Sequence, residues 1–184
     1  HLGLPYTILE QVSPKLDHLI PGLLKEPAIQ RALELFALDM KKEGRAEWFF
    51  ALDGRNKLQL LAAAKLAQQN NHHFTAILTI SRTKDWNQIE LRFPMAYENL
   101  VREEAKAQGV HPALVYGVAR RESAFDPNIV SSAKAQGLMQ LIPSTAKQVS
   151  RSLGIKKLSK SATFDPQTNI RLGARYLKDL LKKF

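Results

Sequence analysis

Glu122 is the residue whose type and surroundings in the sequence point most clearly to chemistry. It closes an apolar helical stretch, four residues after Val118 and seven after Val115. This spacing puts the acid in the stripe that a helix turns toward the core. A carboxyl group there loses hydration, which raises its pKa and lets it hold a proton near neutral pH. The pattern therefore predicts a general acid, with a structural acid paired to an arginine as the alternative.

A second acid, Asp126, lies close to Glu122 in the sequence. Most glycosidases use two carboxylates, one to protonate the leaving oxygen and one to activate water or to attack the sugar. Asp126 is followed by Pro127, however, and Asp-Pro is typical of a turn. We therefore interpret Asp126 as a turn residue, so that Glu122 would act alone with a substrate that supplies the rest of the chemistry.

The residues around Glu122 resemble the signature of a known enzyme family. They are Glu122-Ser123-Ala124-Phe125-Asp126-Pro127, Ser131, Gly137-Leu138-Met139-Gln140, Pro143 and Thr145-Ala146. Other motifs fit at the family's spacings, namely Arg92-Phe93-Pro94-Met95-Ala96-Tyr97 upstream and Asp165-Pro166, Asn169-Ile170, Gly173 and Tyr176-Leu177 downstream. Over roughly residues 28–184 the sequence is similar to the soluble lytic murein transglycosylases, whose catalytic domain resembles goose-type lysozyme.

The resemblance implies non-hydrolytic cleavage of peptidoglycan between N-acetylmuramic acid and N-acetylglucosamine. The 2-acetamido group of the muramic sugar would stabilise the positive charge at the anomeric carbon. The 6-hydroxyl of the same sugar would then close onto that carbon, an intramolecular attack that gains from proximity and leaves a 1,6-anhydro end. Glu122 would first donate a proton and then accept one.

The resemblance also assigns substrate-binding roles to five residues. Ser131 matches a serine that hydrogen-bonds near the acid and the reacting sugar, with a loop cap as the alternative. Gln140 matches a glutamine whose amide holds the substrate, because an amide both donates and accepts, and the alternative is a polar residue at a helix start. Gly137 is expected to allow a close backbone approach or a positive φ. Met139 is expected in the core more often than in a contact, and Phe125 in packing or in sugar stacking.

Three features depart from the family pattern. Lys134 stands where the family usually has a glycine, and a lysine with a positive φ would cost about 1 kcal/mol or more. Ile142 occupies a position that is often methionine. The sequence ends at Phe184, before the family's Ala-Tyr-Asn-Ala-Gly segment, which supplies a tyrosine to the catalytic site. We therefore expect this sequence to be a truncated form of the family's catalytic region.

Positive charge is concentrated in the half of the sequence that carries these motifs. The net charge is +10, and residues 99–184 carry 15 Lys and Arg against 6 Asp and Glu, whereas residues 1–98 carry 12 against 11. A cationic surface attracts polyanions, and the peptide stems of peptidoglycan carry free carboxylates. The basic residues are scattered and show no nucleic-acid-binding motif. We expect peptidoglycan glycan strands as the partner and no nucleic acid.

Composition narrows the class of protein further. The 184 residues are 45% hydrophobic and 24% charged, which is typical of a globular chain with a sizeable core. The absence of cysteine excludes disulfides and thiolate metal sites. His72 and His73 are adjacent and would point in different directions on a helix, so a turn is favoured over a metal pair. We expect no metal and no cofactor.

No targeting or membrane segment is recognisable. No apolar run approaches the ~20 residues that span a bilayer. The first residues, from His1 to Pro5, lack the charged start and apolar core of a signal peptide. The family resemblance implies a periplasmic protein, whose signal peptide would have been removed or would lie outside this sequence.

The helices that must position Glu122 are marked by proline and glycine. Pro94 is expected to start a helix that ends at Gly109, and Pro112 starts the helix that runs into Glu122. Another helix is expected from Pro143 or Ser144 to near Gly154. Asp165 is expected to be the N-cap of a last helix that begins at Pro166.

The first half of the sequence predicts consecutive helix pairs. Ala28 to Lys42 has a helical apolar face and is followed by Gly44, which we interpret as the end signal of that helix. Further helices are predicted over residues 46–52, 57–69, 74–81 and 86–91. The predicted fold is all-α, with a helical array and linker over residues 1–93 and the N-terminal part of a lysozyme-like transglycosylase domain over residues 94–184.

Other functions remain open at this point. Lys134 and the early end of the sequence are compatible with a catalytically impaired module that binds peptidoglycan without turnover. A hydrolase that uses water on the same scaffold would leave a reducing end in place of an anhydro end. The basic charge also leaves a helical nucleic-acid-binding protein as a third alternative.

Overall fold

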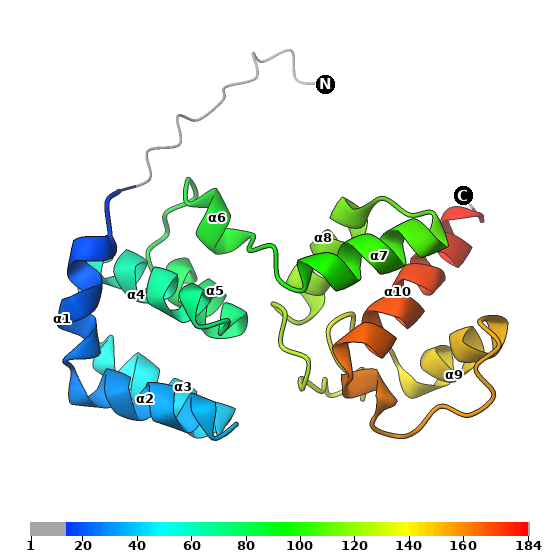
Figure 1. Cartoon of the computed structure of the whole chain (residues 1–184), viewed down its shortest axis with the longest axis horizontal. Coiled ribbons are helices and arrows are strands. Elements are labelled where there is room, and N and C mark those ends of the chain that lie inside the picture. The colour runs from blue at the N-terminus through cyan, green and yellow to red at the C-terminus, as the bar shows by residue number, and fades with distance from the viewer. Residues whose placement is uncertain (1–13, 184) are drawn as a thin grey trace, which may run out of the picture. The chain divides into compact units, whose positions relative to one another are not determined.

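The computed structural model describes residues 14–183 and confirms an all-α fold (Figure 1). No named strand occurs over this range; two isolated bridges, Val130 with Gln136 and Gln136 with Leu141, are its β-type pairings. The start of the chain, where the sequence lacks the pattern of a signal peptide, lies outside the described residues. Among residues 14–183, no helix has both the length and the apolar character needed to cross a membrane. The chain forms two compact units, residues 1–94 and 95–184.

The first unit consists of paired helices around an apolar core. α2 (Pro27–Ala37) packs on α3 (Lys41–Ala51), and α4 (Lys57–Gln69) packs on α5 (His73–Ser81). Three short elements complete the described part: η1 (Asp17–Leu19), α1 (Ile20–Leu24) and α6 (Ile89–Arg92). Trp48 is fully buried, and its indole N–H donates to the Thr79 hydroxyl at 3.0 Å. α4 contributes an almost continuous buried run from Leu60 to Ala64, so it is covered on more than one side.

The predicted helix over residues 28–42 is two helices in the structure. α2 ends at Ala37, because Asp39 adopts a left-handed conformation with φ of 58° and the chain reverses there. α3 then begins at Lys41 and contains both Gly44 and the predicted aromatic helix over residues 46–52. Gly44 is therefore not an end signal. A Cβ at this position would lie 2.6 Å from the Phe36 ring, so the glycine permits the close contact of α2 with α3.

His72 and His73 mark a helix start. His72 is the N-cap residue of α5, and its ring lies 4.3 Å from that of Phe36. Among residues 14–183, no group of three or more His, Cys, Asp or Glu side chains could hold a metal ion.

The second unit is built around α10. It contains α7 (Glu98–Gln108), α8 (Pro112–Glu122), α9 (Pro143–Ser152), η2 (Ala162–Phe164) and α10 (Pro166–Leu181). α10 contacts each of the other four elements. The long segment between α8 and α9, residues 123–142, is irregular and carries most of the motif that surrounds Glu122.

The starts of these helices follow their local sequence, with one exception. Pro112, Pro143 and Pro166 occupy the first helical turn of α8, α9 and α10. The Asp165 carboxylate caps α10 by accepting from the Thr168 amide at 2.8 Å, as predicted. The prediction that Pro94 starts a helix is wrong, because α7 begins four residues later at Glu98, after Tyr97 in a left-handed conformation.

Candidate active site

Glu122 is the last residue of α8, and its side chain is exposed. It faces a cavity of about 260 Å³ between the end of α8, the segment before α9 and the second half of α10. The lining residues are mostly apolar: Val118, Glu122, Met139, Gln140, Leu141, Ile142, Thr145, Gly173, Tyr176, Leu177 and Leu180. The acid thus lies beside a recess and remains open to solvent.

The prediction that Glu122 is buried is wrong, because its side chain is exposed in the structure. The buried face of α8 runs through Val115 and Ala119 and continues to Ser123, the residue after the helix. Positions four apart share one side of a helix, so this line passes one residue beyond Glu122. Val118, four residues before Glu122, is half-buried and also lines the cavity. The side of α8 that carries Val118 and Glu122 therefore forms a wall of the cavity.

The Glu122 carboxylate has no ion-pair or hydrogen-bond partner among residues 14–183. The alternative of a structural acid paired to an arginine is therefore not what the structure shows. The described lining of the cavity also contains no second acid. What remains is one accessible carboxylate on a largely apolar wall.

Ser123 fixes the end of α8 against the segment that carries Met139 and Gln140. Its buried hydroxyl lies 2.7 Å from the Leu138 carbonyl and 3.0 Å from the Ala119 carbonyl, and it accepts from the Phe125 amide at 3.1 Å. These contacts join the last turn of the helix to the turn at Leu138, 15 residues later. They set the position of Glu122 relative to the opposite wall of the cavity.

Asn169 joins the same segment to α10. Its fully buried amide accepts from the Met139 amide at 2.8 Å and donates to the carbonyls of Thr163 and Gln136 at 2.7 and 3.0 Å. All three partners are backbone groups outside the α-helices, and the Gln136 carbonyl also accepts from the Leu141 amide at 3.1 Å. Neither Ser123 nor Asn169 had a predicted role. The signal for Asn169 is a polar residue on the apolar face of the amphipathic helix α10, because a buried polar group needs hydrogen-bond partners.

Two glycines let the backbone segments close up around the cavity. A Cβ on Gly137 would lie 2.2 Å from the Thr163 carbonyl oxygen, and the residue has φ of 75°, so both predicted reasons for glycine are confirmed. A Cβ on Gly173 would lie 2.1 Å from the Met139 sulfur. Met139 is 5% exposed and packs on α10 as a core residue whose remaining surface lines the cavity.

Comparison with known proteins matches both units. The family described as "Soluble lytic murein transglycosylase L domain" matches residues 23–89, and "Transglycosylase SLT domain" matches residues 99–184. The soluble lytic murein transglycosylase of Escherichia coli K12 is 29% identical over 164 residues, covering 89% of this chain and 25% of its own length. A putative soluble lytic murein transglycosylase of Haemophilus influenzae is 30% identical, covering 82% of this chain and 26% of its own length.

A solved structure gives the same result. The lytic transglycosylase Slt of Pseudomonas aeruginosa, crystallised as an inactive mutant with glutamine in place of one glutamate, aligns with a TM-score of 0.83 and 35% identity. The alignment covers 91% of this chain and 27% of that one. The chain belongs to the soluble lytic murein transglycosylase family. It spans about a quarter of the length of these relatives, and every residue that lines the Glu122 cavity lies in its SLT domain.

Within the SLT domain, the Gln140 amide is held by the backbone on its nitrogen side, and its predicted role in holding the substrate stays a prediction. Both hydrogen bonds from its nitrogen go to backbone carbonyls, those of Gly137 at 2.9 Å and Ile129 at 3.1 Å. Its oxygen accepts from no group in residues 14–183. The side chain lines the cavity with Glu122, so the oxygen is the atom through which it could contact a ligand.

Ser131 adopts the arrangement of a loop cap. Its hydroxyl accepts from the Ala135 amide at 3.0 Å, and its own amide donates to the Ala135 carbonyl. It does not line the cavity beside Glu122. The hydroxyl hydrogen has no acceptor within the described range, so Ser131 keeps a donor that it could present to a ligand.

Phe125 and Asp126 are packing and turn residues. Phe125 is 4% exposed and meets the Tyr116 ring edge-on at a centroid distance of 6.3 Å, so this buried ring is not presented for sugar stacking. The Asp126 carboxylate accepts from the Asn128 amide at 3.0 Å, which confirms the predicted turn. Burial raises the pKa of Tyr97, and the negative charge of Asp126 adds to the shift. Tyr97 therefore stays neutral at physiological pH.

The departures of this SLT domain from the family pattern have structural counterparts. Lys134 has φ of 62°, in the left-handed region that favours glycine. Its side chain is exposed, and its amide donates to the Ser131 carbonyl in a tight turn. Ile142 is 45% exposed and lines the Glu122 cavity.

Proposed function

We propose that this chain supplies catalytic residues for lytic cleavage of peptidoglycan, with Glu122 as acid and then base. The substrate is a glycan strand, and the bond that breaks joins N-acetylmuramic acid to N-acetylglucosamine. Residues 94–184 form part of the catalytic domain, and residues 1–93 belong to the helical region that precedes it. Because the substrate is cell-wall material, the proposed compartment is the periplasm.

The observation that carries the proposal is the lone carboxylate beside the apolar cavity. Glu122 is accessible, has no ion-pair partner in the described residues, and faces a recess without a second acid there. Two-carboxylate hydrolysis needs a second carboxylate to activate water or to attack the sugar. A single acid suffices when the nucleophile is part of the substrate.

The proposed reaction is balanced by one proton that leaves Glu122 and returns to it. The protonated carboxyl donates to the glycosidic oxygen as the bond from that oxygen to the anomeric carbon breaks, and N-acetylglucosamine leaves as an alcohol. The 6-hydroxyl oxygen of the muramic sugar bonds to the anomeric carbon, and its proton passes to the Glu122 carboxylate. No water is consumed. The Gln140 oxygen is placed to accept a hydrogen bond from the bound sugar.

The exposure of Glu122 is compatible with this role because substrate itself changes the surroundings of the acid. A sugar in the cavity displaces water from the carboxyl group, and loss of hydration favours its neutral form before the transfer. The inactive glutamate-to-glutamine mutant of the Pseudomonas aeruginosa relative supports a glutamate as the essential group.

The decisive experiment is digestion of purified sacculi, followed by mass spectrometry of the soluble products. We expect 1,6-anhydromuropeptides from the protein and at least a 1,000-fold loss with Glu122→Gln, in the range expected for an acid–base group. Glu103→Gln is the matched control, because Glu103 is an exposed acid of the same unit outside the cavity. Products with reducing ends would show hydrolysis, and unchanged release by Glu122→Gln would overturn the assignment.

A second candidate function is a binding module for peptidoglycan without turnover. Two observations favour it. The Glu122 carboxylate is exposed to solvent, and the Gln140 amide nitrogen already donates to two backbone carbonyls, so it is not available to the substrate. Retention of the protein on sacculi without any soluble product would support this alternative.

A further inference from the structure

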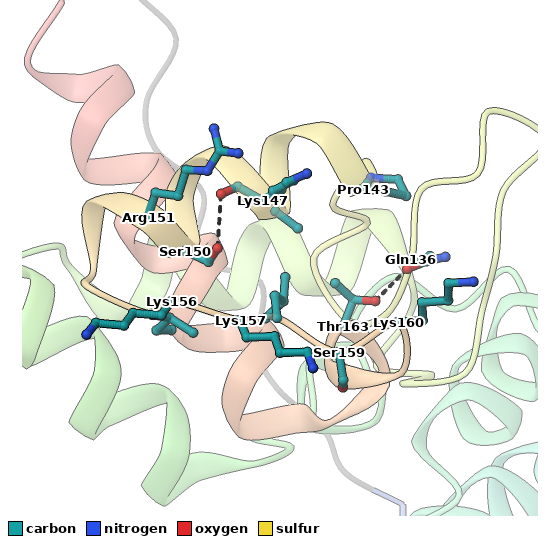
Figure 2. Close-up of a pocket in the computed structure, with 13 residues that line it drawn as sticks. Gln136, Pro143, Lys147, Ser150, Arg151, Lys156, Lys157, Ser159, Lys160 and Thr163 are labelled. Atoms are coloured by element: carbon teal, nitrogen blue, oxygen red, sulfur yellow. Dashed lines mark hydrogen bonds between the residues drawn. The ribbon is translucent and has the colours of Figure 1, made fainter.

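A second cavity, of about 440 Å³, lies in the SLT domain (Figure 2). It is lined by other residues of α9 than the Glu122 cavity. Five of its lining residues are cationic and none is acidic. Lys147 and Arg151 come from α9, and Lys156, Lys157 and Lys160 come from the loop between α9 and η2. Figure 2 shows the two groups on opposite sides of the recess. We call this site the basic pocket.

The charges of the basic pocket are not neutralised by the protein. None of the five cations forms an ion pair with an acid within residues 14–183. All five are exposed. Like charges around one recess repel each other, and an anion that enters the recess relieves this repulsion. The arrangement therefore favours a ligand with more than one negative charge.

The loop that carries three of these lysines is held in place by apolar contacts. Ile155 and Leu158 are half-buried and pack against the cluster of Leu141, Ala146, Val149 and Leu172. Both residues also line the basic pocket. Lys156 and Lys157 lie between Ile155 and Leu158 in the sequence. The packing of these two apolar residues therefore fixes the backbone positions from which the two lysine side chains extend. The pocket is thus a defined feature of the fold and has an apolar floor.

Neutral hydrogen-bonding groups add to the pocket. The Gln136 oxygen accepts from the Thr163 hydroxyl, which orients the amide, and its nitrogen donates to no described residue (Figure 2). Both residues line the pocket with Ser159. An amide N–H and flexible ammonium groups are the donors that carboxylates accept from.

We propose that the basic pocket binds carboxylates of the stem peptide carried by the glycan strand whose sugars occupy the Glu122 cavity. This inference rests on the proposed function and names the part of the substrate that the protein recognises beside the scissile bond. The two cavities share α9: Ile142 and Thr145 line the first, and Pro143 and Ala146 line the second. The first turn of α9 therefore separates the proposed sugar site in the Glu122 cavity from the proposed peptide site in the basic pocket.

The reach of a stem peptide fits this geometry. An α-helix with its side chains is about 10–12 Å across. An extended peptide spans about 3.3–3.6 Å per residue, so five residues reach about 17 Å. A stem that leaves a sugar in the Glu122 cavity can therefore cross the start of α9 and place its carboxylates among Lys147, Lys157 and Lys160.

A confined pocket suits a short anion better than a long polyanion. Nucleic acids are bound along a basic groove or stripe that follows many phosphates. Here the free cations surround one recess, closed below by apolar residues, and the size of the recess corresponds to a few residues of peptide. Nucleic-acid binding at this pocket is an outcome that the experiment tests.

The test compares two ligands and three proteins by titration calorimetry. The ligands are a soluble muropeptide with free carboxyl groups and the same muropeptide with these groups amidated. The proteins are the unchanged chain, the variant Lys157→Gln/Lys160→Gln, and the control Lys182→Gln/Lys183→Gln, which removes the same charge from exposed positions of the same unit outside the pocket. We expect about three- to tenfold weaker binding of the free-carboxyl ligand by the pocket variant, as two exposed ion pairs would give.

The amidated ligand should bind all three proteins equally and weakly, and the control should bind both ligands as the unchanged chain does. Equal affinity of the unchanged chain for both ligands would overturn the proposal. So would tighter binding of a short single-stranded oligonucleotide, lost in the same pocket variant.

Digestion of sacculi separates this inference from the proposed function. If the unchanged protein releases anhydro products and the pocket variant releases them from peptide-free strands at the same rate, but more slowly from peptide-bearing strands, both proposals stand. If neither substrate distinguishes the variant, the peptide site fails and lytic cleavage stands. If the unchanged protein cleaves neither, lytic cleavage fails, and the titration alone decides the peptide site.

Discussion

The two units of the chain are stabilised by different interactions: direct packing of helices in the first, and buried hydrogen bonds to an irregular segment in the second. In the first unit, side chains of α2 to α5 meet directly, and Gly44 and the alanines of α4 allow helices to approach closely. In the second, the segment between α8 and α9 is held by buried polar groups, chiefly Asn169 and Ser123. A catalytic wall built from loop needs such polar links, because its backbone groups have no helical partners.

The sharpest test of this difference is Asn169→Leu. The change keeps the number and branching of the side-chain heavy atoms but leaves the Met139 amide and the Thr163 carbonyl without partners, while the Gln136 carbonyl keeps the Leu141 amide as its donor. We expect a loss of about 4 kcal/mol in the free energy of unfolding, since each buried group left unpaired costs about 1–3 kcal/mol. Denaturant unfolding followed by circular dichroism measures it.

Asn128→Leu is the control for that change, because Asn128 is exposed and its side chain makes no hydrogen bond within residues 14–183. We expect it to shift stability by less than about 0.5 kcal/mol. Equal effects of the two substitutions would show that the amide of Asn169 is not what holds the segment.

The free energy of unfolding of the first unit should fall at acidic pH. Burial lowers the pKa of both His72 and His73, and positive charges on Lys41 and Arg45 lower that of His72 further. The unfolded chain therefore binds these protons at a higher pH than the folded chain. Stability is fully present above the unfolded pKa of about 6.5 and falls as pH drops below it, by at most about 1.4 kcal/mol per pH unit for each histidine.

Tryptophan fluorescence isolates this effect, because Trp48 and Trp86 both lie in the first unit. Unfolding midpoints measured between pH 7.5 and 5.0 should fall, and the slope should flatten in the double variant His72→Gln/His73→Gln. A slope that is the same in both proteins would rule out these histidines as its source.

Lys134→Gly should give the smallest change and the opposite sign. The residue already has a left-handed conformation, which glycine adopts without the cost of a Cβ. We expect a gain of about 0.5–1 kcal/mol in the free energy of unfolding, reduced by the greater freedom of glycine in the unfolded chain. Lys134→Ala keeps the Cβ and should give no gain, so the difference between the two variants in denaturant unfolding is the measure.

Local sequence predicted those parts of the fold that depend on local chemistry. α4 and α8 begin and end at the predicted residues, because Asn56 caps the first and Pro112 starts the second. Gly44 was misread, because an end signal and a close helix contact both call for glycine and only the position of Phe36 separates them. The break at Asp39 came from a left-handed residue inside a pattern that was helical on both sides.

The candidate site was predictable as a set of residues and less so as an arrangement. Glu122, Met139 and Gln140 line one cavity, whereas Ser131 and Phe125 point to other contacts. Helical periodicity placed Glu122 inward, but a residue in the last turn has no following turn to cover it. Two of the three hydrogen bonds of the Asn169 amide join positions 30 or more residues apart, and no local pattern specifies such pairs.

The position of α9 between the two cavities has a consequence for how a substrate would be measured. The helix starts at Pro143, and its residues Ala146 and Val149 are buried in one apolar cluster, so α9 would hold the site of cleavage and the peptide-binding pocket at a fixed separation. A fixed separation would select which glycosidic bond is cleaved. Only a bond at the matching distance from a bound stem peptide would lie beside the Glu122 carboxyl group.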